Sequence, residues 1–170
     1  MKSTFALLFL FGCISLLNAQ ISKTSDESLK PYLTGTWTLV SVTNIYPDGR
    51  KVYPYAENPQ GMLMVDEKGH YAIQILKAIR PKVASGDKNV CTPEENAALV
   101  QGSNSHFGLY SIDDKTKTIT FNIEHASFPN WEGTQQKRSY SFVNNILTYV
   151  VTQTTQGGQS VIAEVAWKKL

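Results

Sequence analysis

The chain has 170 residues, of which 42% are hydrophobic and 18% are charged, a composition typical of one ordinary globular domain. Its 16 Lys and Arg residues nearly balance its 14 Asp and Glu residues, and no segment carries a run of basic residues. Composition and charge therefore argue against a disordered chain, a second domain and a nucleic acid as partner.

Residues 1–19 have the layout of a secretory signal peptide. Lys2 precedes an apolar run from Phe5 to Leu17, and Ala19 supplies a small residue at a cleavage point. The run is too short to span a membrane, so the sequence predicts a secreted or periplasmic protein. Cys13 leaves a second possibility open, a lipid anchor at that cysteine, although the continuing apolar run favours ordinary cleavage.

The remaining chain is predicted to form strands. Residues 20–32 are mostly polar and read as a flexible lead-in to a single domain at 33–170. Residues 34–44 are rich in β-branched side chains, which predicts the first strand, and the turn sequence YPDG follows it. Further strands are predicted at 61–65 with 70–79, 106–112 with 117–126, 134–143 with 146–154, and 160–170 after the turn QGG. About eight strands with short links predict an antiparallel up-and-down barrel, because closure removes the sheet edges.

The segment CTPEENAALVQG predicts the one short helix. Thr92 is suited to the N-cap, Pro93 to the first helical position, and Glu95 completes a capping box. Gly102 ends the pattern, and the helix is expected to lie against the barrel mouth or flank. Cys91 precedes it as the only cysteine of the mature chain, so no internal disulfide is predicted, and its acidic neighbours argue against a reactive thiol.

Motifs for cofactors are missing from the sequence. His70, His106 and His125 lie far apart in the chain and have no metal-ligand spacing. A glycine-rich phosphate loop and a nucleophile elbow are also missing. The sequence therefore predicts neither a metal site nor an organic cofactor.

Several runs resemble the bacterial lipocalin-like domain family. They are GTWTLVSV, PYAENPQGMLMVDEKGHYAIQI, IRP, HFGLYSID, IEHASFPNWEGTQQKRSY and a final AW, so the resemblance covers residues 33–167. It implies a small antiparallel barrel that encloses a ligand cavity, and it implies no particular reaction. The chain departs from the pattern at two places: Asn122 stands where a histidine is expected, and His106 where a tyrosine is expected.

The stretch TQQKRSYSFV places an arginine on the apolar face of a strand. Strand side chains alternate between faces, so Gln136, Arg138 and Tyr140 share the inward face. An unpaired charge buried in a barrel costs on the order of 5 kcal/mol or more. Two interpretations stay open: an ion pair between Arg138 and Glu124, or a grip on an anionic ligand such as a carboxylate.

The preceding strand, ITFNIEHA, leaves the register open. Its apolar face carries Phe121 and is expected to look inward, which would bring His125 toward the mouth of the barrel. An ion pair of Arg138 with Glu124 needs the opposite face. Both arrangements hold together only if the strand contains a β-bulge.

Other candidates come from the neighbouring segments. HFGLY places His106 and Tyr110 on one face, with Gly108 between them leaving room for a close approach. Trp131, in the loop PNWEG, is suited to cover the barrel or to stack on a ring of the ligand. The predicted substrate-binding residues are Arg80, Gln136, Trp131, Asn130, Tyr140, Glu124 and Tyr71.

Two classes of function fit these residues. The first is a cofactor-free lyase or dehydratase that removes a proton next to a carboxylate and expels a hydroxyl, as from a uronic sugar. Arg138 or Arg80 would hold the carboxylate of this small acidic or saccharide ligand. The predicted proton-transfer residues are His125, His106, Tyr110 and Tyr140.

The second class is a non-catalytic periplasmic carrier of a small hydrophobic or amphipathic ligand. Its apolar cup is predicted from Leu39, Met62, Met64, Phe107, Phe121 and Tyr149. The lining of the cavity discriminates between the two: a convergence of Arg138 with a histidine and a tyrosine favours the lyase, and a wholly apolar cup favours the carrier.

Overall fold

The computed structural model describes residues 28–170, except for the side chains of Gln153 and Thr155. The predicted signal peptide and residues 20–27 lie outside the described residues. Strands β1 to β9 span Gly35–Ile45, Lys51–Val52, Gln60–Val65, His70–Leu76, Ser103–Asp113, Thr118–Ala126, Gln135–Val143, Ile146–Gln156 and Gln159–Lys169. Helix α1 spans Pro93–Gln101, and the 3₁₀ helix η1 spans Pro129–Trp131.

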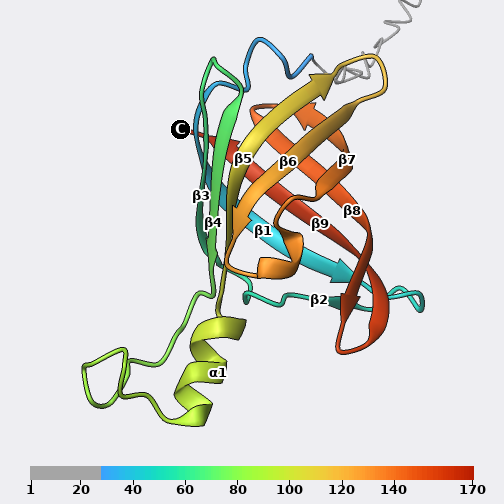
Figure 1. Cartoon of the computed structure of the whole chain (residues 1–170). Coiled ribbons are helices and arrows are strands. Elements are labelled where there is room, and N and C mark those ends of the chain that lie inside the picture. Colours follow the sequence, from blue (N-terminus) through green and yellow to red (C-terminus); the bar gives the residue numbers. More distant parts are fainter. Residues whose placement is uncertain (1–27) are drawn as a thin grey trace, which may run out of the picture.

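The sheet closes on itself (Figure 1). Strands pair antiparallel in the order β2-β1-β3-β4-β5-β6-β7-β8-β9, and β1 also pairs with β9. Strand β2 adds only a two-residue pairing at the end of β1, so the closed barrel has eight strands. The predicted all-β barrel with one short helix is confirmed, whereas β2 and η1 were not predicted.

One end of the barrel is filled by apolar side chains. Trp37, Phe142 and Trp167 are fully buried there, and the Trp37 indole donates a hydrogen bond to the carbonyl of Leu33. Residues 28–34 pack against this core at the top of Figure 1, where Leu29 is also fully buried. Leu29 lies in the segment that the sequence predicted as a flexible lead-in, yet its side chain is part of the apolar core. The packed part of the chain therefore begins before residue 33.

A carboxylate fastens this N-terminal segment. Asp114, in the turn after β5, accepts hydrogen bonds from the Ser28 hydroxyl at 2.7 Å and the Leu29 amide at 3.1 Å. The Tyr140 hydroxyl also donates to Asp114, at 2.5 Å. Burial raises the pKa of Asp114, but these hydrogen bonds outweigh it and the net pKa is lowered.

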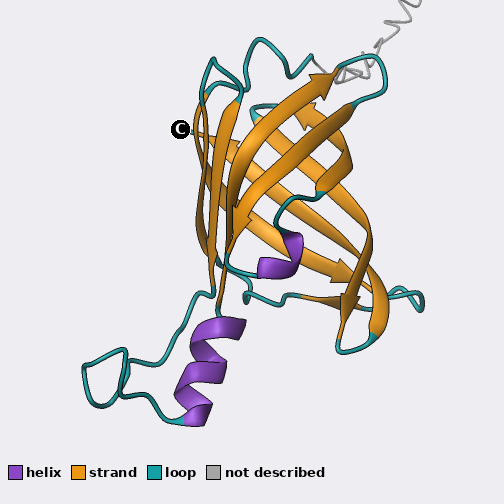
Figure 2. Ribbon diagram, viewed as in Figure 1, coloured by secondary structure: helices purple, strands orange, loops and turns teal. Residues whose placement is uncertain are grey.

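Helix α1 begins as its sequence predicts but does not pack as expected. Thr92 and Glu95 form the reciprocal capping box, and Pro93 occupies the first turn. The helix projects beyond the end of the barrel opposite the Trp37 core (Figure 2), and none of its residues is buried. The expectation that it lies against the barrel is therefore wrong, because Val100 is exposed and Ala98 and Leu99 are only half-buried.

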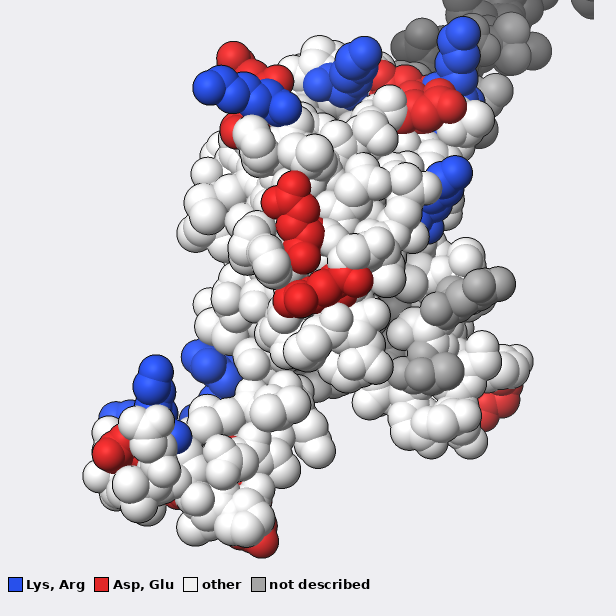
Figure 3. All heavy atoms as spheres, in the orientation of Figure 1, with Lys and Arg blue, Asp and Glu red and all other residues white. Residues whose placement is uncertain are grey.

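The outer surface carries both charge signs. Basic and acidic side chains are interspersed on the viewed face, and basic ones gather on the protrusion formed by α1 and its preceding loop (Figure 3). That loop, residues 77–92, contains Lys77, Arg80, Lys82 and Lys88.

Candidate functional site

The barrel interior opens into a cavity of about 720 Å³, called here the lumen cavity. It lies in the half of the barrel away from Trp37, and side chains from β1, β4, β5, β7, β8 and β9 line it. Four predicted site residues are among them: His106, Trp131, Gln136 and Arg138. The volume lies within the range of small-molecule sites.

Arg138 is the buried cation of this cavity. It is 6% exposed, and its guanidinium carbon lies 4.9 Å from the ring centre of Phe121 and 4.7 Å from that of Tyr149. Nη2 donates a hydrogen bond of 2.5 Å to the side-chain oxygen of Gln136, two residues earlier on the same face. Gln136 thus orients the guanidinium, while the two rings hold its position.

The positive charge of Arg138 is not neutralised within the described part of the chain. No carboxylate there lies within ion-pair distance of the guanidinium, and buried Nε has no hydrogen-bond partner. Cation–π contacts offset only part of the cost of removing the charge from water. An anion entering the lumen cavity would therefore find a fixed and poorly solvated cation.

His106 and Tyr71 form a neutral pair in the same cavity wall. The Tyr71 hydroxyl and His106 Nδ1 are 2.8 Å apart, and both residues are buried. Burial, and secondarily the charge of Arg138, lowers the pKa of His106 to about 3. Burial also raises the pKa of Tyr71, so both side chains are neutral at pH 7.

The tautomer of His106 follows from this pairing. A neutral tyrosine donates a hydrogen bond, so Nδ1 is the acceptor and carries no proton. The proton of the neutral imidazole is therefore on Nε2. His106 therefore presents an N–H donor rather than a base. Trp131 stands edge-on to the imidazole, with the ring centres 6.1 Å apart.

The family comparison agrees with this geometry. A lipocalin-like domain matches residues 34–170, which covers the whole barrel. The chain belongs to the lipocalin-like domain family. Lipocalin barrels enclose cavities for small ligands, so family and fold together support a ligand-binding barrel. No curated protein matches the chain.

A bulge in this lipocalin-like barrel turns two candidates away from the lumen. Between the pairs Phe107–His125 and Gly108–Ile123 the register of β5 and β6 shifts by one residue, at Glu124. Glu124 and His125 are both exposed, and His125 Nδ1 lies 3.5 Å from the Glu132 carboxylate. The predicted inward His125 is therefore wrong, because the bulge changes the phase of alternation after Glu124. The Arg138–Glu124 ion pair is wrong as well, because Glu124 follows the inward Ile123 and points outward.

Gly108 allows this bulge. Its φ is +155°, and a Cβ at this position would lie 2.2 Å from the carbonyl oxygen of Asn122 on β6. The space that the glycine leaves is thus occupied by the neighbouring strand and not by a ligand.

Four other candidates also lie away from the lumen cavity. The Tyr110 hydroxyl donates to the Asp66 carbonyl at 3.1 Å, and Tyr140 bonds Asp114 at the closed end. Arg80 and Asn130 are exposed and do not line the cavity. Tyr110 and Tyr140 point away from the lumen cavity because their partners, Asp66 and Asp114, lie in the β3–β4 and β5–β6 turns at the closed end of the barrel.

The predicted apolar cup is only partly present. Phe121 and Tyr149 are buried beside Arg138, and Leu39 is buried too. Met62, Met64 and Phe107 are roughly half exposed and face outward, because Leu63, Val65 and His106 take the inward positions of their strands. The prediction of these three residues as cup residues is therefore wrong.

Sequence reasoning missed several lining residues. Asn104 shares a strand face with His106, but the strand was predicted to start only at residue 106. Tyr55 reaches the cavity from the link between β2 and β3; burial raises its pKa, and a hydrogen bond with Asn104 opposes that shift. Lys77 adds positive charge at the opening, and no Asp or Glu of the described residues lines the cavity.

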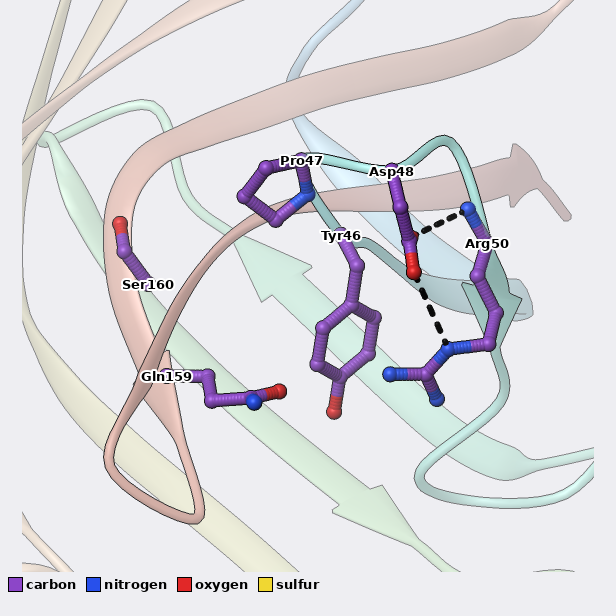
Figure 4. A pocket seen from close by; sticks show the side chains of 6 residues that line it. All are labelled: Tyr46, Pro47, Asp48, Arg50, Gln159 and Ser160. Atoms are coloured by element: carbon purple, nitrogen blue, oxygen red, sulfur yellow. Dashed lines mark hydrogen bonds and ion pairs between the residues drawn. The ribbon is translucent and has the colours of Figure 1, made fainter.

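A second hollow lies outside the barrel, between the β1–β2 turn and the β8–β9 hairpin (Figure 4). It measures about 400 Å³ and also contains an arginine, Arg50. Arg50 Nε lies 3.8 Å from the Asp48 carboxylate, and its guanidinium stacks 3.9 Å above the ring centre of Tyr46. The charge of Arg50 is already paired, so this hollow is a weak candidate for an anion site.

Residues 28–170 contain neither a metal-ligand cluster nor a helix that could cross a membrane. In that range no three His, Cys, Asp or Glu side chains gather to hold a metal ion. The helices in that range are too short and too polar to cross a membrane.

Proposed function

We propose that the lumen cavity binds a small organic acid and that Arg138 holds its carboxylate. One observation carries the proposal: Arg138 is a buried cation that lines the cavity without an ion-pair partner among residues 28–170. A carboxylate supplies the missing charge and two acceptor oxygens, which match the fork of the guanidinium.

The rest of the lumen cavity suits the body of such an acid. Val42, Val151 and Val165 form an apolar wall on β1, β8 and β9, and Trp131 offers an aromatic surface near the opening. Lys77, next to the opening, raises the positive potential there and would draw anions toward the cavity. The ligand class is therefore an acid with an apolar or ring-shaped body. The predicted signal peptide would place this binding in the periplasm or outside the cell.

Calorimetric titration with a panel of small carboxylates and acidic sugars tests the proposal. Arg138→Gln should weaken carboxylate binding about 10- to 100-fold, the value of a lost charge-assisted hydrogen bond pair. Arg50→Gln removes the same charge at the outer hollow and should leave affinity unchanged. Equal affinities in the wild type and Arg138→Gln would contradict the proposal.

An elimination reaction is the second candidate, favoured by the His106–Tyr71 pair in the same wall as Arg138. Arg138 would stabilise the enolate-like charge, and His106 Nε2–H would donate to an oxygen of the substrate. His106 is too weak a base for proton removal, since burial lowers its pKa to about 3, so a water molecule in the cavity would have to accept the proton from the carbon while the hydroxyl leaves as water. A new ultraviolet band from a conjugated double bond, formed from an acid that binds, would support elimination; binding without this band would leave a carrier of acids.

A further inference from the structure

We propose that Asn104 and His106 together bind a hydroxyl group of the ligand, so that the lumen cavity selects hydroxy acids over simple and oxo acids. The inference rests on the proposed function, because Arg138 must hold the carboxylate of the same molecule. It adds Asn104 as a residue that determines specificity.

The two side chains share one face of β5. Asn104 and His106 are two residues apart, pair with Ile75 and Ile73 of β4, and both line the lumen cavity. Strand alternation therefore points them to the same side. Arg138 and His106 both contact the ring of Phe121, so the carboxylate site and the β5 pair flank the same part of the cavity.

Each of the two side chains has an unused hydrogen-bonding atom. Asn104 Oδ1 is buried and has no hydrogen-bond partner among the described residues. His106 Nδ1 is occupied by Tyr71, which leaves Nε2–H as the donor of the imidazole. Both residues line the lumen cavity, and leaving a buried polar atom unpaired is unfavourable, so a ligand hydroxyl would draw the Asn104 amide toward the lumen to satisfy Oδ1.

Only some ligand groups satisfy both atoms at once. A hydroxyl accepts from His106 Nε2–H and donates its own proton to Asn104 Oδ1. A carbonyl oxygen accepts but cannot donate, and an ammonium donates but cannot accept. A site built to hydrogen-bond a hydroxyl rejects analogues that lack it, since its own polar groups are then left unpaired.

Matched cyclohexane acids test this inference by titration calorimetry. The probes are cyclohexanecarboxylate, its 2-, 3- and 4-hydroxy derivatives, the corresponding oxo acids, and glucuronate. We expect at least one hydroxy acid to bind about tenfold tighter than both the parent and the matching oxo acid. Asn104→Leu should abolish this preference, so that the variant binds the hydroxy acid no tighter than it binds cyclohexanecarboxylate.

The test needs one control variant and one substitute for the test variant. Gln74→Leu makes a similar amide-to-leucine change on the exposed outer face of β4 and should retain the preference. Asn104→Ala serves if Asn104→Leu does not fold, as judged by circular dichroism. Equal affinity of wild type for hydroxy, oxo and parent acids, or a preference that survives both Asn104 variants, overturns the inference. Failure of every acid to bind instead overturns the proposed function.

Discussion

At the closed end of the barrel Trp37, Phe142 and Leu147 have no exposed surface and pack mainly against other apolar side chains. The open end places Arg138, His106 and several amides around a cavity of about 720 Å³. Both ends belong to the same eight strands, yet only one is solid. The comparison indicates that the closed end supplies most of the stability, whereas the open end keeps polar groups that folding alone does not require.

Truncation of a closed-end side chain should give the largest effect. Phe142→Ala removes a fully buried ring that contacts the rings of Trp37 and Tyr32, and it should lower the free energy of unfolding by about 3–5 kcal/mol. Urea unfolding measures this change. Ile79→Ala, at a residue 84% exposed, is the control and should change stability by less than about 0.5 kcal/mol. Similar losses of unfolding free energy in Phe142→Ala and Ile79→Ala would show that the closed end does not supply most of the stability.

The loss of folding stability in acid should come from His106 at the open end of the barrel. The folded-state pKa of His106 is lowered to about 3 from 6.5, so the unfolded chain binds the extra proton first as pH falls. Stability is therefore lost between pH 6.5 and about 3, by on the order of 3 kcal/mol at pH 4. Tyr71, whose hydroxyl bonds the imidazole, stays protonated over this range because burial raises its pKa.

His106→Gln should flatten this part of the pH profile, as followed by urea unfolding at several pH values. His125→Gln changes an exposed histidine on the outer face and should leave most of the slope in place. A slope that survives His106→Gln would assign the acid sensitivity to other groups, such as the carboxylate of Asp114.

The strands and the inward arginine could be predicted because they depend on local patterns. Alternation along β7 was enough to place Gln136 and Arg138 inside, since β7 is regular and its outward residues are plainly polar. The capping box of α1 is likewise a four-residue signal. Each of these features depends on residues that are close together in the sequence.

The rest of the site depends on contacts that local patterns do not encode. The bulge at Glu124 turns His125 outward, and only the approach of β6 to Gly108 in three dimensions determines its position. Strand β3 is apolar on both faces, so hydrophobicity could not tell that Met64 faces out and Leu63 faces in. Tyr55 reaches the cavity from a link between strands, where side-chain direction has no period.

Replacement of Arg138 should separate stability from binding. Arg138→Met keeps an unbranched stem and removes an unpaired buried charge, so the free energy of unfolding should rise by about 1 kcal/mol while carboxylate binding is lost. Urea unfolding and calorimetric titration on the same sample measure both effects. A loss of several kcal/mol would identify Arg138 as a structural residue and would remove the basis of the proposed function.

The smallest effect is expected outside both ends, at helix α1. Thr92→Ala removes the side-chain cap that accepts from the Glu95 amide and should destabilise the helix by about 1 kcal/mol. Because none of the α1 residues is buried, the helix can fray without exposing the barrel core, and global unfolding should stay unchanged. Hydrogen exchange should therefore speed up in residues 93–101 and not in β5 or β7. If the unfolding midpoint falls along with helix protection, α1 is coupled to the barrel and the stability of the open end depends on it.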